Sequence, residues 1–143
     1  MIKIFEITEA DDETLDAVNR LLPQLSKSSK LINRSTLQKL SNSECTRLYV
    51  AKEDDTIFGM LSLVVFSIPT GTKAWIEDVV VDERARGKGV GRELMNHALN
   101  VAKELGAKSA DLTSRPSREA ANKLYQAIGF EGRETNVYRF SIS

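Results

Sequence analysis

The chain has 143 residues, of which 41% are hydrophobic and 28% are charged, so we expect one folded domain over residues 1–143. Lysine and arginine together number 20, as do aspartate and glutamate, and this balance argues against the broad basic surface that nucleic-acid binding needs. The single cysteine, Cys45, excludes an intrachain disulfide framework. With no apolar run of about 18 residues and no leader-like start, we expect a cytoplasmic protein with no membrane partner.

The first quarter of the chain predicts a strand followed by two helices. Residues 2–8 are rich in β-branched and aromatic side chains, which is typical of a strand. Within residues 9–25, leucine and valine recur at helical spacing after an acidic start, and Pro23 is expected to kink or end this helix. Residues 24–45 are polar and serine-rich, with a short helix expected over 35–40.

The middle of the chain predicts three strands. Residues 46–53 and 56–66 have the pattern of a hairpin, in which Gly59 indicates a bulge. A loop over residues 69–73 leads to a strand over 74–81, which ends in a continuous apolar run typical of a strand covered on both faces.

The last part alternates helix and strand. Apolar residues at helical spacing predict a helix over 89–105, and a strand follows over 108–114. Ser117 is expected to cap a helix that runs to residue 128. Residues 130–135 and 136–142 are expected to form two final strands. The resulting order of strands and helices predicts a mixed α/β sheet.

Glycines and basic residues are concentrated in the joint between strand 74–81 and the next helix. A strand, a glycine-rich turn and a helix start together make an anion-binding arrangement, because free N–H groups point out of the first helical turn. Glycines let an anion approach the main chain, and basic side chains add positive charge. The residues of this joint are Arg86, Gly87, Lys88, Gly89, Val90, Gly91 and Arg92.

Three phosphate-binding motifs can be compared with this joint. A Walker A loop requires Ser or Thr after its lysine, whereas Lys88 is followed by Gly89. A dinucleotide fingerprint requires G-x-G-x-x-G, and residues 87–91 are one residue short of it. The pattern R-x-x-G-x-G over residues 86–91 resembles the coenzyme A pyrophosphate loop of the GNAT superfamily of N-acetyltransferases. The alternative is a tight, solvated turn that binds nothing.

The resemblance covers nearly the whole chain and implies the α/β GNAT fold. This fold has a central mixed, mostly antiparallel sheet of six to seven strands, splayed between strands four and five and flanked by about four helices. It implies that the pantetheine arm of the coenzyme pairs with backbone groups of Val79, Val80 and Val81, and that the N–H of Val79 stabilises the developing oxyanion.

The stretch "REAANKLYQAIGF", residues 118–130, is similar to the last helix of that family. Tyr125 then matches the general acid that protonates the departing thiolate; the alternative is an aromatic residue of the core. Asn122 is placed to bond the pantetheine amides. Arg118 stands where many members have asparagine, and it is a candidate to pair with a coenzyme phosphate.

Two neighbouring acids on strand 74–81 are candidates for accepting the amine proton. Glu77 is preferred as base or amine ligand and Asp78 is second, with a solvated strand-end charge as the alternative for each. Strand alternation is expected to put them on opposite faces, with Glu77 on the face of Val79 and Val81. The stretch "IEDVVV" is similar to glucosamine-6-phosphate N-acetyltransferases, but Thr113-Ser114 stands where those enzymes carry an acid.

Residues 24–43 contain four basic residues and no acid, which bears on the acceptor. In the family this region often covers the acceptor site, so an amine that carries a phosphate or carboxylate is favoured over a polycation. A basic surface helix with no ligand is the alternative. The only histidine, His97, cannot build a metal cluster or a Ser-His triad, so no metal is expected.

The resemblance therefore implies an acetyl-CoA-dependent N-acetyltransferase, in which the amine of a small acceptor attacks the thioester carbonyl directly. Two alternatives stay open: a non-catalytic sensor domain that binds coenzyme A or an acyl-CoA, and an acetyltransferase of protein lysines or N-termini. A homodimer is also compatible with the resemblance.

Overall fold

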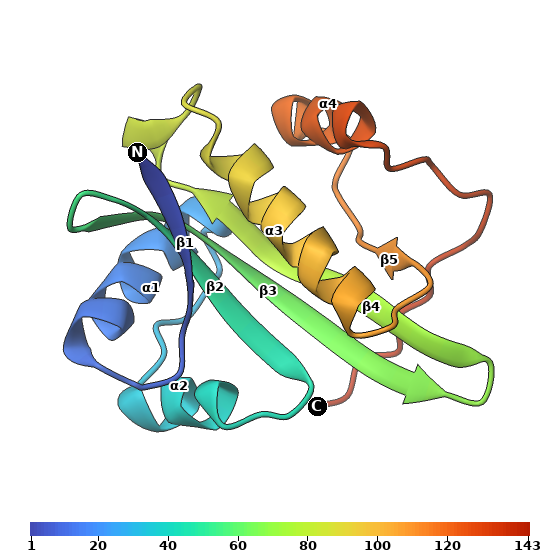
Figure 1. Cartoon of the computed structure of the whole chain (residues 1–143), viewed down its shortest axis with the longest axis horizontal. Coiled ribbons are helices and arrows are strands. Elements are labelled where there is room, and N and C mark those ends of the chain that lie inside the picture. The colour runs from blue at the N-terminus through green and yellow to red at the C-terminus, as the bar shows by residue number, and fades with distance from the viewer. The chain divides into compact units, whose positions relative to one another are not determined.

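The computed structural model describes residues 1–143, which divide into two compact units, residues 1–113 and residues 114–143 (Figure 1). The elements of the first unit are β1 (Ile2–Glu6), α1 (Asp12–Leu25), α2 (Arg34–Ser41), β2 (Thr46–Glu53), β3 (Thr56–Ile68), β4 (Gly71–Val81), the 3-10 turn η1 (Glu83–Ala85), α3 (Val90–Glu104) and β5 (Ala110–Asp111). The second unit contains α4 (Glu119–Ile128). The single domain expected over residues 1–143 stays a prediction.

The first unit is built on one five-stranded sheet with the order β1-β2-β3-β4-β5. Its first four strands pair antiparallel, and β5 pairs parallel to β4. The register of β4 against β5 contains only Ala74 with Ala110 and Trp75 with Asp111. Residues 76–81 of β4 therefore have β3 as a neighbour but no partner in β5, which confirms the expected splay between the fourth and fifth strands (Figure 1).

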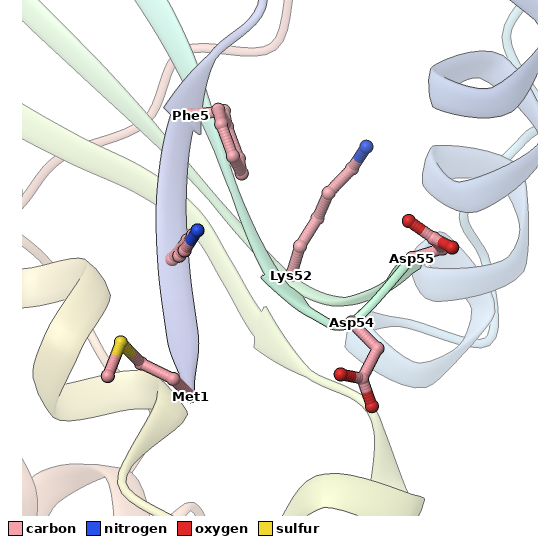
Figure 2. Close-up of a pocket in the computed structure, with 6 residues that line it drawn as sticks. Met1, Phe5, Lys52, Asp54 and Asp55 are labelled. Carbon is pink, nitrogen blue, oxygen red and sulfur yellow. The ribbon is translucent and has the colours of Figure 1, made fainter.

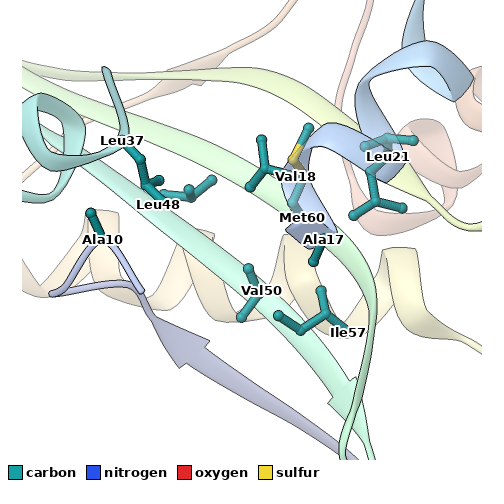
Figure 3. Packing of buried hydrophobic residues seen from close by; sticks show 10 residues of the cluster. Ala10, Ala17, Val18, Leu21, Leu37, Leu48, Val50, Ile57 and Met60 are labelled. Carbon is teal, nitrogen blue, oxygen red and sulfur yellow. The ribbon is translucent and has the colours of Figure 1, made fainter. Parts of the chain in front are cut away.

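One face of the sheet is covered by α1 and α2. Strand residues Val50 and Met60 pack against these helices in one apolar cluster (Figure 3). Val80 of β4 belongs to the same cluster. Helix α1 begins where the side chain of Asp11 accepts a hydrogen bond from the N–H of Thr14 at 2.8 Å, which satisfies one of the free donors of the first turn. The other members of the cluster are Ala10, Ala17, Val18, Leu21, Leu37, Leu48 and Ile57.

The opposite face of the sheet is covered by α3. Gly59 lies under the start of this helix, where a Cβ atom would come within 2.9 Å of Val90 Cγ1 and 3.1 Å of Leu94 Cδ1. The absence of a side chain at residue 59 lets the first turn of α3 lie directly on β3. The bulge expected at Gly59 is confirmed, because the β2–β3 register shifts between Ala51 and Lys52, opposite Gly59 and Ile57.

A second bulge interrupts β4 at the predicted acidic pair. Ser62 pairs with Glu77 and Met60 pairs with Val80, so two residues of β4 stand opposite one of β3, and Asp78 has a left-handed φ of 51°. The extra residue reverses the alternation, since paired residues share a face. Glu77 therefore shares its face with Val80, and the expectation that it shares a face with Val79 and Val81 is wrong.

The expected count of six to seven strands is also wrong, because residues 130–135 and 136–142 form no strand. Residues 136–142 carry a strand-like sequence pattern, and Val137 and Phe140 are exposed. An alternating pattern of apolar and polar residues becomes a strand only where the backbone of another strand lies beside it for pairing. The sequence pattern alone does not show whether such a neighbour exists.

Two helix ends differ in detail from the sequence expectation. Pro23 lies inside the last turn of α1, and the helix ends at Leu25, where the N–H of Ser26 bonds Leu22 O at 3.1 Å. Helix α4 begins after Arg118, and Ser117 does not cap it. No helix of the chain combines the length and the apolar character needed to cross a bilayer.

Candidate active site

Regular strand alternation, just before the β4 bulge, brings an indole and a carboxylate together on the face covered by α1 and α2. Trp75 and Glu77 pair with Val64 and Ser62, which lie on the same face of β3. The Trp75 indole N–H donates a hydrogen bond to Glu77 Oε2, and Glu77 is exposed. The indole thus fixes one carboxylate oxygen and leaves the other open to a ligand. Sequence reasoning gave Trp75 no chemical role, although the spacing of two residues along a strand could have indicated the contact.

Asp78 lies next to this pair in a different electrostatic environment. Partial desolvation raises the pKa of Asp78 above its ordinary value of 3.8, and the charge of Glu77 raises it further. Its left-handed backbone conformation, rare for residues other than glycine, asparagine and aspartate, follows from the bulge. Two neighbouring carboxylates with different surroundings therefore stand at the splayed end of β4.

The glycine joint forms an open turn at the start of α3. Gly87 and Gly89 have left-handed φ angles of 82° and 84°, and an added Cβ atom would meet no protein atom within 4 Å at either position. Gly89 is the N-cap residue of α3, and no side chain caps that helix. The basic residues of the turn, Arg86, Lys88 and Arg92, are exposed.

This turn fits a pyrophosphate. The N–H groups at the start of α3 receive no side-chain acceptor, the positive end of the helix dipole lies there, and no Cβ atom blocks the approach at Gly87 or Gly89. The predicted coenzyme residues from Arg86 to Arg92 thus lie together in one contiguous turn. Their role in binding stays a prediction, as does that of the backbone of Val79, Val80 and Val81 at the splayed end of β4.

A buried carboxylate, missed by sequence reasoning, anchors the chain just before the open turn. Asp82 is 1% exposed. Its carboxylate accepts hydrogen bonds from Arg20 Nη1 of α1, from the Arg84 N–H at 3.0 Å and from Arg84 Nη2 at 3.0 Å. The hydrogen bond from the Arg84 side chain is the main reason that the pKa of Asp82 lies below 3.8.

The same anchor is tied to β3 and α1 by further bonds. The Asp82 N–H bonds Phe58 O at 2.8 Å, and Arg20 Nη2 donates to Ile57 O at 2.7 Å. Gln24 Oε1 accepts from the Glu83 N–H at 2.9 Å. An acid directly before a short polar turn, with an arginine two residues later, is the only sequence signal that could have pointed to this cluster.

The second unit contains the residues predicted on the last helix. Tyr125 is 6% exposed, and its ring meets that of Phe130 edge-on with centroids 6.0 Å apart. Burial raises the pKa of the Tyr125 phenol, so it is protonated at neutral pH. The hydroxyl therefore has the proton that a general acid needs.

Asn122 serves the start of α4 within this unit. Its side-chain amide donates to Arg118 O at 2.8 Å and to Arg115 O at 2.9 Å. Both contacts use Nδ2, so only Oδ1 is left for another partner. The proposed contact of Asn122 with pantetheine is thereby limited to a group that donates a hydrogen bond. Arg118 is the N-cap residue of α4, and its pairing with a phosphate stays a prediction.

One of the four basic residues of segment 24–43 is paired within the fold, and the other three form no ion pair. Arg34 bonds Ala10 O at 2.5 Å and forms an ion pair with Asp12, so its charge is used within the fold. The connection between α1 and α2 is held by Asn19, which accepts from the Ile32 N–H and donates to Ile32 O. Lys27, Lys30 and Lys39 take part in none of the ion pairs of the structure.

A hollow of about 430 Å³ lies elsewhere, beside β1 and the β2–β3 turn (Figure 2). Lys52 Nζ forms an ion pair with Glu13 and lies 5.6 Å from the centroid of the Phe5 ring. No predicted site residue lines this hollow, and its charges are of mixed sign. Its lining residues are Met1, Lys3, Phe5, Lys52, Asp54 and Asp55.

Comparison with known proteins gives a family match over most of the chain. The model of the acetyltransferase (GNAT) family matches residues 11–130. An uncharacterised N-acetyltransferase of Methanocaldococcus jannaschii is 34% identical over 61 residues, 43% of this chain and 27% of that protein. YwnH of Bacillus subtilis, provisionally named a phosphinothricin acetyltransferase, is 31% identical over 91 residues, 62% of this chain and 56% of that protein. The matched regions thus span about half or less of the length of these curated relatives.

Solved structures show the same fold at low sequence identity. An aminoglycoside acetyltransferase from an uncultured soil metagenomic sample, in complex with sisomicin, has a TM-score of 0.86 at 21% identity, covering 99% of this chain and 96% of that one. Glucosamine-6-phosphate N-acetyltransferase from Arabidopsis thaliana has a TM-score of 0.81 at 20% identity, covering 98% of each chain. The local similarity to aminosugar enzymes is therefore matched by a shared fold, and it does not establish their acceptor.

Proposed function

The chain belongs to the acetyltransferase (GNAT) family, and on that basis we propose that it moves an acetyl group from acetyl-CoA to a primary amine of a small acceptor. The observation that carries the proposal is the open turn from Arg86 to Arg92, where α3 begins without a side-chain cap next to the splayed end of β4. This backbone is suited to the coenzyme pyrophosphate. The shared fold with a glucosamine-6-phosphate N-acetyltransferase gives no reason to prefer glucosamine-6-phosphate over other amines as the acceptor.

The coenzyme supplies the acetyl group as a thioester, and the side chains of this chain move protons. Glu77, held by the Trp75 indole, takes a proton from the acceptor amine directly or through a water molecule. An N–H of β4 near the bulge, that of Val79 in our assignment, stabilises negative charge on the carbonyl oxygen. Tyr125 donates its phenolic proton to the departing sulfur.

The acceptor is proposed to carry an anionic group beside its amine. Glu77 pairs with Ser62 on the face of the sheet covered by α1 and α2, and the exposed lysines Lys27, Lys30 and Lys39 belong to these helices and their connection. A carboxylate for the amine, and exposed lysines on the helices that cover its face of the sheet, favour a zwitterionic small molecule over a polycation.

An acceptor panel with released thiol as readout tests the activity and its acceptor class together. The panel contains phosphinothricin, glucosamine-6-phosphate, an aminoglycoside, a polyamine and a lysine peptide. We expect transfer to an anionic amine at a higher kcat/KM than to the polyamine. Coenzyme binding without transfer to any amine would favour the sensor domain, and preferential transfer to the peptide would favour a protein acetyltransferase.

Tyr125→Phe tests the general acid. We expect kcat to fall by roughly 100-fold or more, because loss of a general acid typically costs this much. The coenzyme dissociation constant should stay unchanged, since the ring is kept. Equal kcat in the two proteins would remove the role assigned to Tyr125.

The two carboxylates are separated by the pH dependence of kcat/KM. If Asp78 were the base, Glu77→Gln would shift the acidic limb to lower pH, because the charge of Glu77 raises the pKa of Asp78. We expect Glu77→Gln to lower kcat/KM across the pH range, and Asp78→Asn to retain most of the activity. The reverse pattern would transfer the role to Asp78.

A further inference from the structure

The chain immediately before the open turn is bonded to three elements through one buried residue, Asp82. The backbone of Asp82 bonds β3, its side chain receives Arg20 from α1, and both the backbone and the guanidinium of Arg84 close on it from η1. Arg84 also lies over the Phe58 ring, 5.3 Å from its centroid.

We propose that Asp82 is a positioning residue for the coenzyme, which holds residues 86–91 in their binding conformation through its bonds to Arg20 and Arg84. This inference rests on the proposed function, because it assumes that the open turn binds the pyrophosphate. Because Asp82 is buried, it acts through the backbone of the turn and not by direct contact with the coenzyme.

The physical reason is the contrast in local support. Gly87 and Gly89 have no side chains, and a Cβ atom there would meet nothing within 4 Å, so the turn itself makes few contacts that could hold its shape. Glycine has more conformational freedom to lose than other residues, and a turn that is not held would lose that freedom on binding. Bonds at Asp82 fix the end from which the turn starts, so part of this cost is met during folding.

The link to α1 gives the proposal a second element. Arg20 reaches both Asp82 and Ile57 O, and Gln24 of the same helix bonds the Glu83 N–H. The helix that covers the Glu77 face of the sheet is therefore bonded to the segment that leads into the coenzyme turn. Loss of Arg20 should weaken coenzyme binding although this residue lies on a different element.

Calorimetric titration of coenzyme A into Asp82→Asn tests the proposal. We expect binding at least about tenfold weaker than in the unaltered protein, because a turn that adopts its binding conformation about a tenth of the time binds about tenfold more weakly. Arg20→Gln should weaken binding in the same direction. Because the two residues share one bond, their effects should be less than additive in the double variant.

A truncated substrate separates positioning of the turn from general damage to the fold. S-acetyl-pantetheine lacks the pyrophosphate, so kcat/KM with this thioester should be unchanged in both variants, while KM for acetyl-CoA rises. Glu6→Gln is the matched control, because it removes the 3.1 Å ion pair with Arg47 at the β1–β2 edge, away from the turn. It should leave coenzyme affinity as it was.

Unchanged coenzyme affinity in a folded Asp82→Asn protein would overturn the proposal, as would an equal loss of kcat/KM with both thioesters. If Asp82→Asn does not fold, Arg20→Gln decides by the same criteria, because this arginine is partly exposed. Failure of the unaltered protein to bind coenzyme A at all would instead overturn the proposed function, and this inference with it.

Discussion

The connection between β4 and α3 has two halves that are built in opposite ways. In residues 82–85, Asp82 is buried, its side chain and backbone are bonded, and Ala85 is buried as well. In residues 86–89 every residue is exposed, and Gly87 and Gly89 have left-handed backbones with open space around them. The first half uses side chains to hold the chain, whereas the second half leaves the backbone accessible.

The difference shows how a chain can present main-chain donors without losing their geometry. Side chains that held the turn from within would occupy the space that a pyrophosphate needs. The turn is held instead by the bonds of Asp82 before it and by the packing of α3 on β3 at Gly59 after it. This arrangement leaves the space over the turn open. The following substitutions either close the open half or loosen the held half.

The largest effect is expected for Gly89→Asp, which closes the open half. A carboxylate at the N-terminus of α3 would occupy the anion site with the wrong charge, so coenzyme A affinity should fall by roughly 100-fold or more, as expected for several kT of lost electrostatic attraction. Titration calorimetry measures the loss.

Gly106→Asp is the matched control, because Gly106 has a φ of 89° at the far end of the same helix and open space around it. It carries a similar backbone strain but should leave coenzyme affinity unchanged. A comparable loss of affinity in both variants would show that strain and not charge is responsible.

A smaller effect, on stability, is expected for Gly59→Ala under α3. The new Cβ atom would lie 2.9 Å from Val90 Cγ1 and 3.3 Å from Val80 O, and the backbone oxygen cannot move aside easily. Overpacking of this kind typically lowers the free energy of unfolding by about 1–3 kcal/mol. Urea denaturation provides the measurement, and an unchanged midpoint would mean that α3 is not seated as described.

Residues 82–85 should also make the stability of the protein depend on pH, through Asp82. Bonds from Arg84 lower the pKa of Asp82 below 3.8 in the folded chain. Its contribution to the free energy of unfolding is therefore complete above the pKa of the unfolded chain and is lost as pH falls through the folded pKa. The stability difference between the unaltered protein and Asp82→Asn should be constant from about pH 7 to pH 5 and should narrow below about pH 4. A difference that stays constant in acid would contradict this.

The smallest effect is expected for Gln24→Ala, which removes the bond from α1 to the Glu83 N–H. A single exposed hydrogen bond contributes about 0.5–1.5 kcal/mol at most, and water can replace it here. The unfolding midpoint should shift slightly and coenzyme affinity less than in Arg20→Gln. If Gln24→Ala lowered coenzyme affinity as much as Arg20→Gln, Gln24 and not Arg20 would be the main contact between α1 and residues 82–85.

Local patterns predicted most of the fold. The β2 boundaries, the α2 boundaries to within one residue, the glycine joint and the splay between β4 and β5 followed from periodicity and the family resemblance. The β4 bulge could not be predicted, because a pattern of alternating faces contains no signal for an inserted residue at Asp78. Asp82 was missed because its partner Arg20 lies 62 residues away in sequence. Residues 136–142 were misassigned because alternation was taken as sufficient for a strand.

Trp75 is the only tryptophan of the chain, and its indole N–H is bonded to Glu77. The protein therefore carries a built-in fluorophore on the carboxylate that we assign to the acceptor amine. Its emission should respond when a cation takes up the free oxygen of Glu77, and the response should disappear in Glu77→Gln. Acceptors can thus be ranked by optical titration in the absence of coenzyme, before any turnover has been measured.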